Sequence, residues 1–158
     1  MHLFSASRHV ERVADHASSI AKVAGRLAPA KGLRWPTALL EMGQRIPVMC
    51  HTLLRAVLDE DADTARRVVE EDEIIDTLEK RLFDEVQDLM RDESDSLRTG
   101  LLVYRVGREL ERVGDLMKNI AEDVIYLATG EIVRHELKRQ QHEAQRQGTE
   151  QQPGSGPG

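Results

Sequence analysis

Apolar residues along this chain recur at alternating intervals of four and three, the spacing of a helix that buries one stripe against partner helices. The clearest stripe consists of Val106, Leu110, Val113, Met117, Ile120, Val124 and Leu127. A second occurs near the start of the chain at Ala6, Val10, Val13, Ala17, Ile20, Ala24 and Leu27. A third consists of Val68, Ile75, Leu78, Leu82, Val86 and Leu89. Because no segment alternates with a period of two, the pattern predicts an all-α protein.

Helix breakers separate the first two predicted helices. The first is expected over about residues 5–27 and is closed by the Ala-Pro-Ala-Lys-Gly segment at 28–32. The second is expected over about residues 36–58, with Pro36 at its start, where a missing N–H costs nothing. Pro47 should bend this helix or mark its true beginning.

Capping residues define the other two predicted helices. The third should begin at Asp61 or Asp63, either of which is an adequate N-cap, and should end near residue 91. The fourth should be opened by Ser94 or Asp95 and should end near residue 129. Gly130 is then expected to follow it in the left-handed conformation.

Residues 8–22 recur one hundred residues later as residues 108–122. Seven of the fifteen pairs are identical, namely Arg8/Arg108, Glu11/Glu111, Arg12/Arg112, Val13/Val113, Asp15/Asp115, Ile20/Ile120 and Ala21/Ala121. Such a repeat indicates that one supersecondary unit has been duplicated. The last three predicted helices form a complete antiparallel three-helix bundle over residues 33–134. Residues 1–32 then provide one extra N-terminal helix, the last member of an incomplete first repeat.

Residues 135–158 are rich in Gln, Arg and Glu and finish with a Pro/Gly/Ser segment. This composition cannot bury enough apolar surface to offset the entropy of ordering the chain. We therefore expect a disordered polar tail.

The amino-acid composition limits the kinds of molecule that this chain is expected to bind. The net charge of −6, from 28 acids and 22 bases, would repel a phosphate backbone, so direct binding to nucleic acid is not expected. No apolar run approaches the roughly 20 residues that cross a bilayer, and no signal peptide is recognisable at the N-terminus. The single cysteine, Cys50, cannot form an intramolecular disulfide. Together these features predict a cytoplasmic protein.

Each copy of the repeat carries a Glu-x-x-x-Asp pair, which places two carboxylates one helical turn apart on the same face. The pairs are Glu11/Asp15 and Glu111/Asp115, and both point away from the apolar stripe at about 100° per residue. Asp72 and Asp76 form a third pair with this spacing. The carboxylates could be solvated acids in ordinary intrahelical ion pairs. Alternatively, they could converge from neighbouring helices on a metal ion, and the repetition of the pair at the same phase favours this reading.

Other candidate residues give weaker signals. His16 could supplement a metal site next to Asp15, although a histidine on a helix surface usually has no such role. Cys50 and His51 lie on a predicted helix with no second cysteine, so a zinc site there would need distant ligands. Glycines at 100, 107 and 114 are spaced by seven residues and indicate close helix–helix approach.

The segment 108–122, Arg-Glu-Leu-Glu-Arg-Val-Gly-Asp-Leu-Met-Lys-Asn-Ile-Ala-Glu, resembles the signature of the PhoU family of accessory regulators of bacterial phosphate uptake. Residues 10–17 resemble the other copy of that signature, and residues 72–78 resemble the acidic motif of the preceding helix. The resemblance covers about residues 3–134. It implies a PhoU-like all-α fold of three-helix repeats that is cytoplasmic and commonly homodimeric.

The resemblance also implies a multinuclear iron or zinc cluster held by carboxylates on the bundle surface. Carried over residue by residue, the metal ligands would be Asp72, Asp76, Glu111 and Asp115. Glu11 and Asp15 would belong to a second, incomplete site, because the acidic helix that would complete it is missing. Leu116 and Met117 replace the usual His-Ala of the signature, so a histidine contribution is lost.

The implied function is that of a negative regulator of phosphate uptake and of the phosphate-starvation response. Such a protein is an adaptor between the ATPase of the phosphate ABC transporter and its sensor histidine kinase. No nucleophile–base pair, phosphate loop or organic-cofactor fingerprint is recognisable, so we expect no catalytic residues and no enzymatic activity. Two alternatives are a carboxylate-bridged metal enzyme and a plain oligomerising helical bundle.

Overall fold

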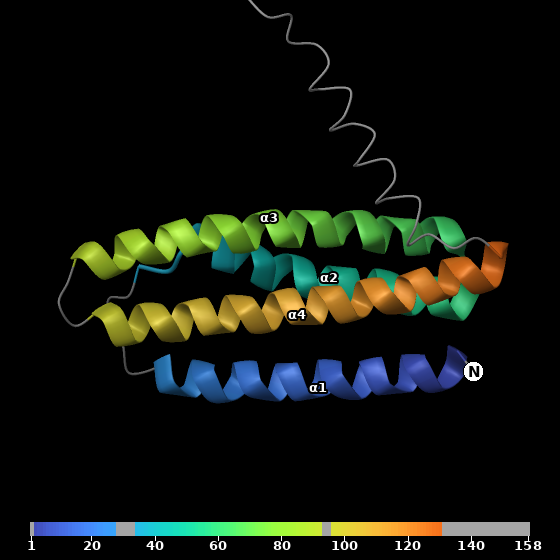
Figure 1. Ribbon diagram of the computed structural model, residues 1–158, viewed down its shortest axis with the longest axis horizontal. Coiled ribbons are helices and arrows are strands. Elements are labelled where there is room, and N and C mark those ends of the chain that lie inside the picture. The colour runs from blue at the N-terminus through green and yellow to red at the C-terminus, as the bar shows by residue number, and fades with distance from the viewer. Residues whose placement is uncertain (1, 28–33, 93–95, 131–158) are drawn as a thin grey trace, which may run out of the picture.

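The computed structural model consists of four α-helices, and it describes residues 2–27, 34–92 and 96–130 (Figure 1). The helices are α1 (His2–Leu27), α2 (Thr37–Asp59), α3 (Ala62–Asp92) and α4 (Ser96–Thr129). Over the described part of the chain no strand is present, so the predicted all-α class is confirmed. The expected polar tail at 135–158 lies outside the described residues.

The helix α4 is the centre of the molecule, because it packs against each of the other three helices. The helices α2, α3 and α4 contact one another and form a three-helix bundle, as the sequence predicted. The extra helix α1 contacts only α4 among the described elements. It lies antiparallel along α4, on the side away from α3 (Figure 1).

The predicted stripes of α3 and α4 contribute a large part of the core, which α2 completes. From the α4 stripe, five residues are at least 91% buried, namely Val106, Leu110, Val113, Met117 and Ile120. Leu127 is 65% exposed, so its assignment to the core was wrong: it lies in the last turn, where little packs over the helix. The stripe prediction also missed Val103 and Ile125, which are fully buried because α4 is enclosed on three sides.

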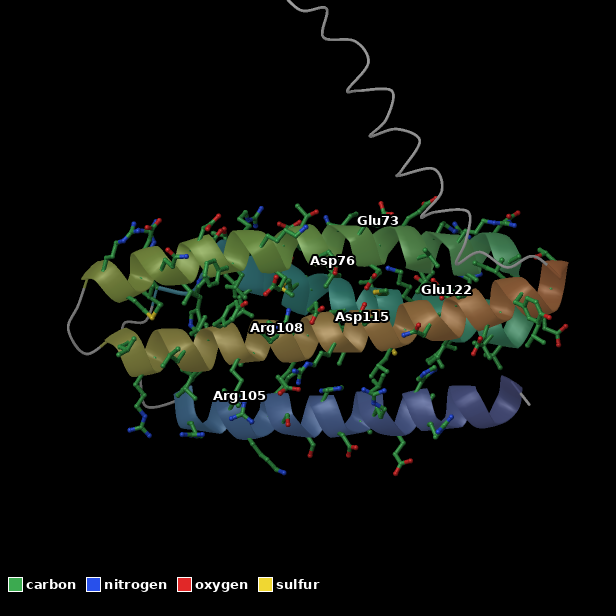
Figure 2. The ribbon with its side chains drawn as sticks, viewed as in Figure 1. Glu73, Asp76, Arg105, Arg108, Asp115 and Glu122 are labelled. Atoms are coloured by element: carbon green, nitrogen blue, oxygen red, sulfur yellow. The ribbon has the colours of Figure 1, made fainter. Side chains whose placement is uncertain are left out.

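Only part of the predicted apolar stripe of α1 packs against the core. Val13, Ile20 and Leu27 pack in or against the core, whereas Val10, Ala17 and Ala24 are exposed. The side chain of Ala6 lies outside the described residues. The contact with α4 instead uses a face rotated toward His16 and Val23, of which Val23 is 98% buried. On the α4 side of this contact, Arg105 points toward α1 (Figure 2).

The glycines at 100, 107 and 114 mark close contacts between α4 and α3, as predicted. A Cβ atom at Gly100 would lie 2.5 Å from the Cγ of Met90, and a Cβ at Gly107 would collide with the side chain of Leu82. At Gly114 the nearest atom is Oδ1 of Asp72, at 3.0 Å from such a Cβ. The absence of side chains at these positions therefore sets how close α3 and α4 lie.

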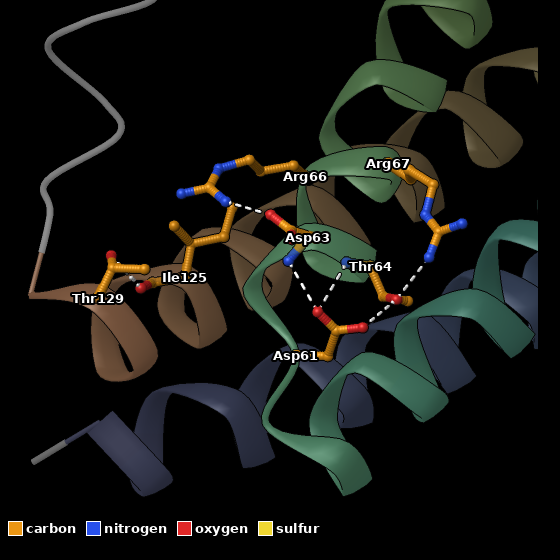
Figure 3. Close-up of polar contacts among 7 residues, drawn as sticks. All are labelled: Asp61, Asp63, Thr64, Arg66, Arg67, Ile125 and Thr129. Atoms are coloured by element: carbon orange, nitrogen blue, oxygen red, sulfur yellow. Dashed lines mark hydrogen bonds and ion pairs between the residues drawn. The ribbon is translucent and has the colours of Figure 1, made fainter.

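Capping residues explain the start of α3 and the end of α4, whereas Ser94 and Asp95, which were expected to open the fourth helix, lie outside the described residues. Asp61, and not Asp63, is the N-cap of α3, because its Oδ1 accepts hydrogen bonds from the backbone N–H of Asp63 at 2.9 Å and of Thr64 at 3.2 Å (Figure 3). After α4, Gly130 has φ +70° and donates its N–H to the carbonyl of Tyr126 at 2.8 Å, which confirms its predicted role. Glu60 occupies the left-handed region after α2 with φ 51°. Pro47 lies inside α2 and does not mark its beginning.

Candidate functional site: an acidic cluster between two helices

Four carboxylates gather where α3 and α4 run side by side, and we call them the α3–α4 acidic cluster. Its members are Asp72, Asp76, Glu111 and Asp115. The spacing of four residues on each helix places each pair on one face, and the packing of α3 on α4 brings the two faces together. Figure 2 shows Asp76 on α3 near Asp115 on α4.

The cluster is more enclosed than the helical phase predicted. Asp72 has a side chain that is only 1% exposed, and the side chain of Glu111 is 16% exposed. Sequence phase placed Glu111 away from the apolar stripe of α4, but α3 covers that side of the helix. Asp115 is exposed and Asp76 is partly buried, so the cluster extends from the core to the surface.

Asp72 is held by Lys118, a residue that the sequence reasoning did not select. The Nζ of Lys118 donates to Oδ2 of Asp72 at 2.7 Å, across an interval of 46 residues. Gly114 makes room for the other carboxylate oxygen, because a Cβ there would press on it. Lys118 lies three residues after Asp115, on the same side of α4, and this spacing was the available signal.

The protonation of the cluster reflects its burial and its crowding. Burial raises the pKa of Asp72, and the negative charges of Asp76 and Asp115 raise it further against the opposing effect of Lys118. Burial likewise raises the pKa values of Asp76 and Glu111, and Asp115 adds to both shifts. Burial disfavours the charged form of Lys118, but the bond to Asp72 and the surrounding acids raise its pKa overall. The cluster is therefore a region of unbalanced negative charge.

A second group of polar residues lies next to the cluster, between α3 and α4. Glu79 accepts a hydrogen bond from the hydroxyl of Tyr104 at 2.7 Å. The Nη1 of Arg108 lies 3.4 Å from Glu79 and 3.5 Å from Oε2 of Glu111. Glu79 follows Asp76 by three residues on α3, so the same helical spacing could have identified it.

The donor atoms of the cluster fit a divalent cation in their chemistry. Oδ1 of Asp72 and Oε2 of Glu111 are buried without a hydrogen-bond partner, and carboxylate oxygens are ligands for hard and borderline cations. In residues 2–27, 34–92 and 96–130, however, no three His, Cys, Asp or Glu side chains lie close enough together to hold a metal ion. Lys118 is the cation that meets the buried carboxylate in this structure.

Glu11 and Asp15 are not brought to the α3–α4 acidic cluster. Both are exposed on α1, whose only helix contact in the described structure is with α4. His16 does not join them either. Its Nδ1 lies 2.6 Å from Oε2 of Glu109, a residue of α4 that is 92% buried, so His16 contributes to the packing of α1 on α4.

Cys50 and His51 lie on α2, away from the acidic cluster. Cys50 is partly buried and is a free thiol. His51 is exposed and lines a pocket between α2 and α3. Neither residue belongs to a group of potential metal ligands within the described part of the chain.

Comparisons with known proteins agree on one family. The family described as "PhoU domain" matches residues 39–124. A phosphate-specific transport system accessory protein PhoU homolog of Deinococcus radiodurans is 33% identical over 121 residues, which are 77% of this chain and 57% of the relative. A homolog of the same name from Pseudomonas putida is 36% identical over 138 residues, 86% of this chain and 54% of the relative.

A solved structure shows the same similarity. The crystal structure of the phosphate transport system regulatory protein PhoU from Streptococcus pneumoniae superposes with a TM-score of 0.74 at 32% sequence identity. The match covers 84% of this chain and 62% of that chain. The chain thus spans little more than half the length of the relatives it matches.

Proposed function

This chain belongs to the PhoU family, and on that premise we propose that it is a negative regulator of phosphate uptake and of the phosphate-starvation response. It acts as an adaptor between the ATPase of the phosphate ABC transporter and the sensor histidine kinase, as a homodimer in the cytoplasm, and it has no catalytic role. The observation that carries this proposal is the match of the PhoU domain to residues 39–124. In the described part of the chain, no helix is apolar and long enough to span a bilayer.

We further propose that iron or zinc binds at the α3–α4 acidic cluster, with Asp72, Asp76, Glu111 and Asp115 as ligands. The buried Oδ1 of Asp72, which has no hydrogen-bond partner, supports this proposal, as does the repulsion that Asp76 and Asp115 exert on Asp72. A bound cation would supply positive charge that relieves the repulsion among these carboxylates. Lys118 would have to share Asp72 with that cation or move away from it.

The test is a double substitution, Glu111→Ala with Asp115→Ala, in the full chain. We expect the variant to lose metal, measured by elemental analysis of the purified protein, and to derepress phosphate-starvation genes in phosphate-rich medium. Helicity should change little, because Asp115 is exposed and Glu111 is not a member of the apolar core. Repression at the wild-type level in this variant would contradict the metal-dependent form of the proposal.

A matched control replaces two acids of α3 outside the cluster, Glu73→Ala with Asp84→Ala. Both residues are exposed, and Figure 2 shows Glu73 on the side of α3 away from α4. This control changes the net charge by the same amount and should retain both metal and repression. Native mass spectrometry before and after chelation reports the subunit number and the metal mass together, and a metal-free monomer would argue against both the dimer and the metal.

A further inference from the structure

The helix α2 exposes large apolar side chains on the face that points away from the bundle. Four of them form what we call the α2 outer stripe, and their exposed fractions are 52% for Leu40, 66% for Val48, 55% for Leu54 and 81% for Leu58. The opposite face of the same helix supplies core residues such as Met42 and Met49, which are at least 98% buried. The helix α2 therefore has two apolar faces, and only one of them is buried within this bundle.

The α2 outer stripe extends along most of the helix, with Gln44, His51 and Arg55 between its apolar members. At about 100° per residue, its four members fall within roughly 120° of one another around the helix axis. From Leu40 to Leu58 the stripe is about 27 Å long, at 1.5 Å per residue. Four large apolar side chains that share one exposed helix face provide the apolar contacts of an interaction site.

A pocket of about 640 Å³ opens beside the stripe, between α2 and α3. Val48 belongs to both the stripe and the pocket, and Met49 and Val68 complete the apolar part of the lining. The polar part of the lining carries three arginines and one histidine, namely Arg45, Arg55, Arg67 and His51. This pocket could receive a large apolar side chain from a partner that lies along the stripe.

The charges around the pocket contrast with the chain as a whole, which has a net charge of −6. Arg45 is neutralised by Glu41 at 3.0 Å and by Glu71 at 2.7 Å. Arg67 donates to the hydroxyl of Thr64 at 2.7 Å and not to a carboxylate. Arg55 is exposed and forms no ion pair with any residue that the structure describes. Arg55 is therefore available to a carboxylate of a partner, and Arg67, whose charge also acts on Asp61, can meet a second one.

We propose that the α2 outer stripe and the adjoining α2–α3 pocket dock an amphipathic helix of a partner protein, whose apolar face is flanked by acidic residues. This inference rests on the proposed adaptor function, since an adaptor needs a surface for its partner. The apolar stripe matches the face of such a helix, and Arg55 and Arg67 match its acidic flank. A small anion would not account for apolar residues that extend beyond the pocket over the length of α2.

The first test uses a designed helical peptide as the probe, with leucines at intervals of three and four and glutamates beside them. Its binding to the full chain is measured by fluorescence anisotropy. The variant Val48→Ser with Leu54→Ser and Leu58→Ser should bind it at least about tenfold more weakly, because three contacts of the apolar face are lost. All three residues are exposed in the free protein, so the fold should be retained, which circular dichroism checks.

Two comparisons make this test specific. Leu101→Ser removes an apolar residue that is 57% exposed on α4, and it should leave peptide binding unchanged. The variant Arg55→Glu with Arg67→Glu should bind the glutamate peptide more weakly than the wild type does. It should bind more tightly a peptide in which lysines replace the glutamates. Equal binding of the glutamate peptide by the wild type and the triple serine variant would overturn the proposal. A wild-type dimer that the triple serine variant abolishes, with no peptide binding, would also overturn it, since a second copy would then occupy the stripe.

A cellular test separates this inference from the proposed function. Deletion of the gene should derepress phosphate-starvation genes, and the triple serine variant should derepress them to a similar extent. If the deletion has no effect, the regulatory role itself fails. If the deletion derepresses these genes but the triple serine variant represses them like the wild type, the proposed docking surface is wrong and the regulatory role is retained.

Discussion

Asp72 is the residue in which burial and charge conflict most strongly. Its side chain is 1% exposed, and one of its two carboxylate oxygens has no hydrogen-bond partner. The other oxygen is held by Lys118 at 2.7 Å. A charged group that is buried in this way is tolerated only while its partner is present, because its hydration has been lost.

Lys118→Met should therefore destabilise the protein by roughly 1 to 3 kcal/mol, since it leaves the Asp72 carboxylate without its counter-ion. The free energy of unfolding is measured by urea denaturation of chelator-treated protein at neutral pH. Lys80→Met, at an exposed position of α3, is the control and should change stability by less than about 0.5 kcal/mol. Adding Asp72→Asn to Lys118→Met should recover part of the loss, and no recovery would show that Asp72 is not the cause.

Asp76 provides a test of the electrostatics that depends on pH. Burial and the charge of Asp115 raise its pKa above the ordinary value of 3.8, although Lys118 and Lys80 oppose the shift. Between the ordinary and the raised pKa the folded state binds more protons than the unfolded state, so the free energy of unfolding falls as the pH rises through this window. The charged form of Asp76 thus costs stability at neutral pH.

Asp76→Asn removes this cost. The stability of the variant minus that of the wild type should increase as the pH rises from the ordinary pKa of 3.8 through the raised pKa of Asp76, and should then stay level. Urea denaturation of chelator-treated protein at several pH values measures it, with Asp84→Asn as an exposed control on the same helix. A difference that shrinks with rising pH would mean that Lys118 dominates the environment of Asp76.

At the scale of the helices, α4 carries glycine where it meets α3 most closely. Gly107 has the side chain of Leu82 where its own Cβ would be, whereas Gly25 on α1 has no atom within 4 Å of that position. The space around the two positions therefore differs: Gly107 lies in the interior of α4, where glycine costs about 1 kcal/mol relative to alanine, and Gly25 lies in the last turn of α1.

Gly107→Ala should destabilise the protein by roughly 1 to 2 kcal/mol, because overpacking against Leu82 exceeds the gain in helix propensity. Gly25→Ala should stabilise it by about 0.5 kcal/mol or less, because only the propensity term acts there and that term is smaller in the last turn of a helix. Thermal and urea denaturation of the two variants measure both effects. Stabilisation by Gly107→Ala would mean that α3 and α4 can move apart at little cost.

At the scale of the whole molecule, α1 is the helix with the fewest neighbours. Among the helices that the structure describes it packs on α4 alone, and Val10, Ala17 and Ala24 are exposed. Its attachment depends on residues such as Val23, Leu27 and the contact of His16 with Glu109. The core residues other than Val23 and Leu27 all belong to α2, α3 and α4.

Hydrogen exchange should accordingly show that amides of α1 exchange at least about tenfold faster than those in the centre of α3, because α1 can open without unfolding the bundle. Val23→Ala should accelerate exchange in α1 further and leave the centre of α3 nearly unchanged. Mass spectrometry of peptic fragments resolves the two regions. Equal protection of α1 and α3 would indicate that the four helices unfold as one unit.

The sequence by itself determined the helices, the duplicated segment and the family. Spacings of three and four report which residues share a face, and residues such as Asp61 and Gly130 act on neighbours within a turn, so these features need only local information. The two signature pairs of acids could likewise be placed on helix faces before any contact was known. Binding of a metal at these residues stays a prediction.

Only the tertiary structure decided which of those faces is covered. Asp72 is buried because α4 packs over its side of α3, and it meets Lys118 from 46 residues away. The face of α1 that contacts α4 is rotated from the apolar stripe because, in the described part of the chain, the helix packs against one neighbour and not two. A helical pattern specifies the direction of each side chain around its own axis, but burial and charge pairing depend on the neighbour that lies in that direction.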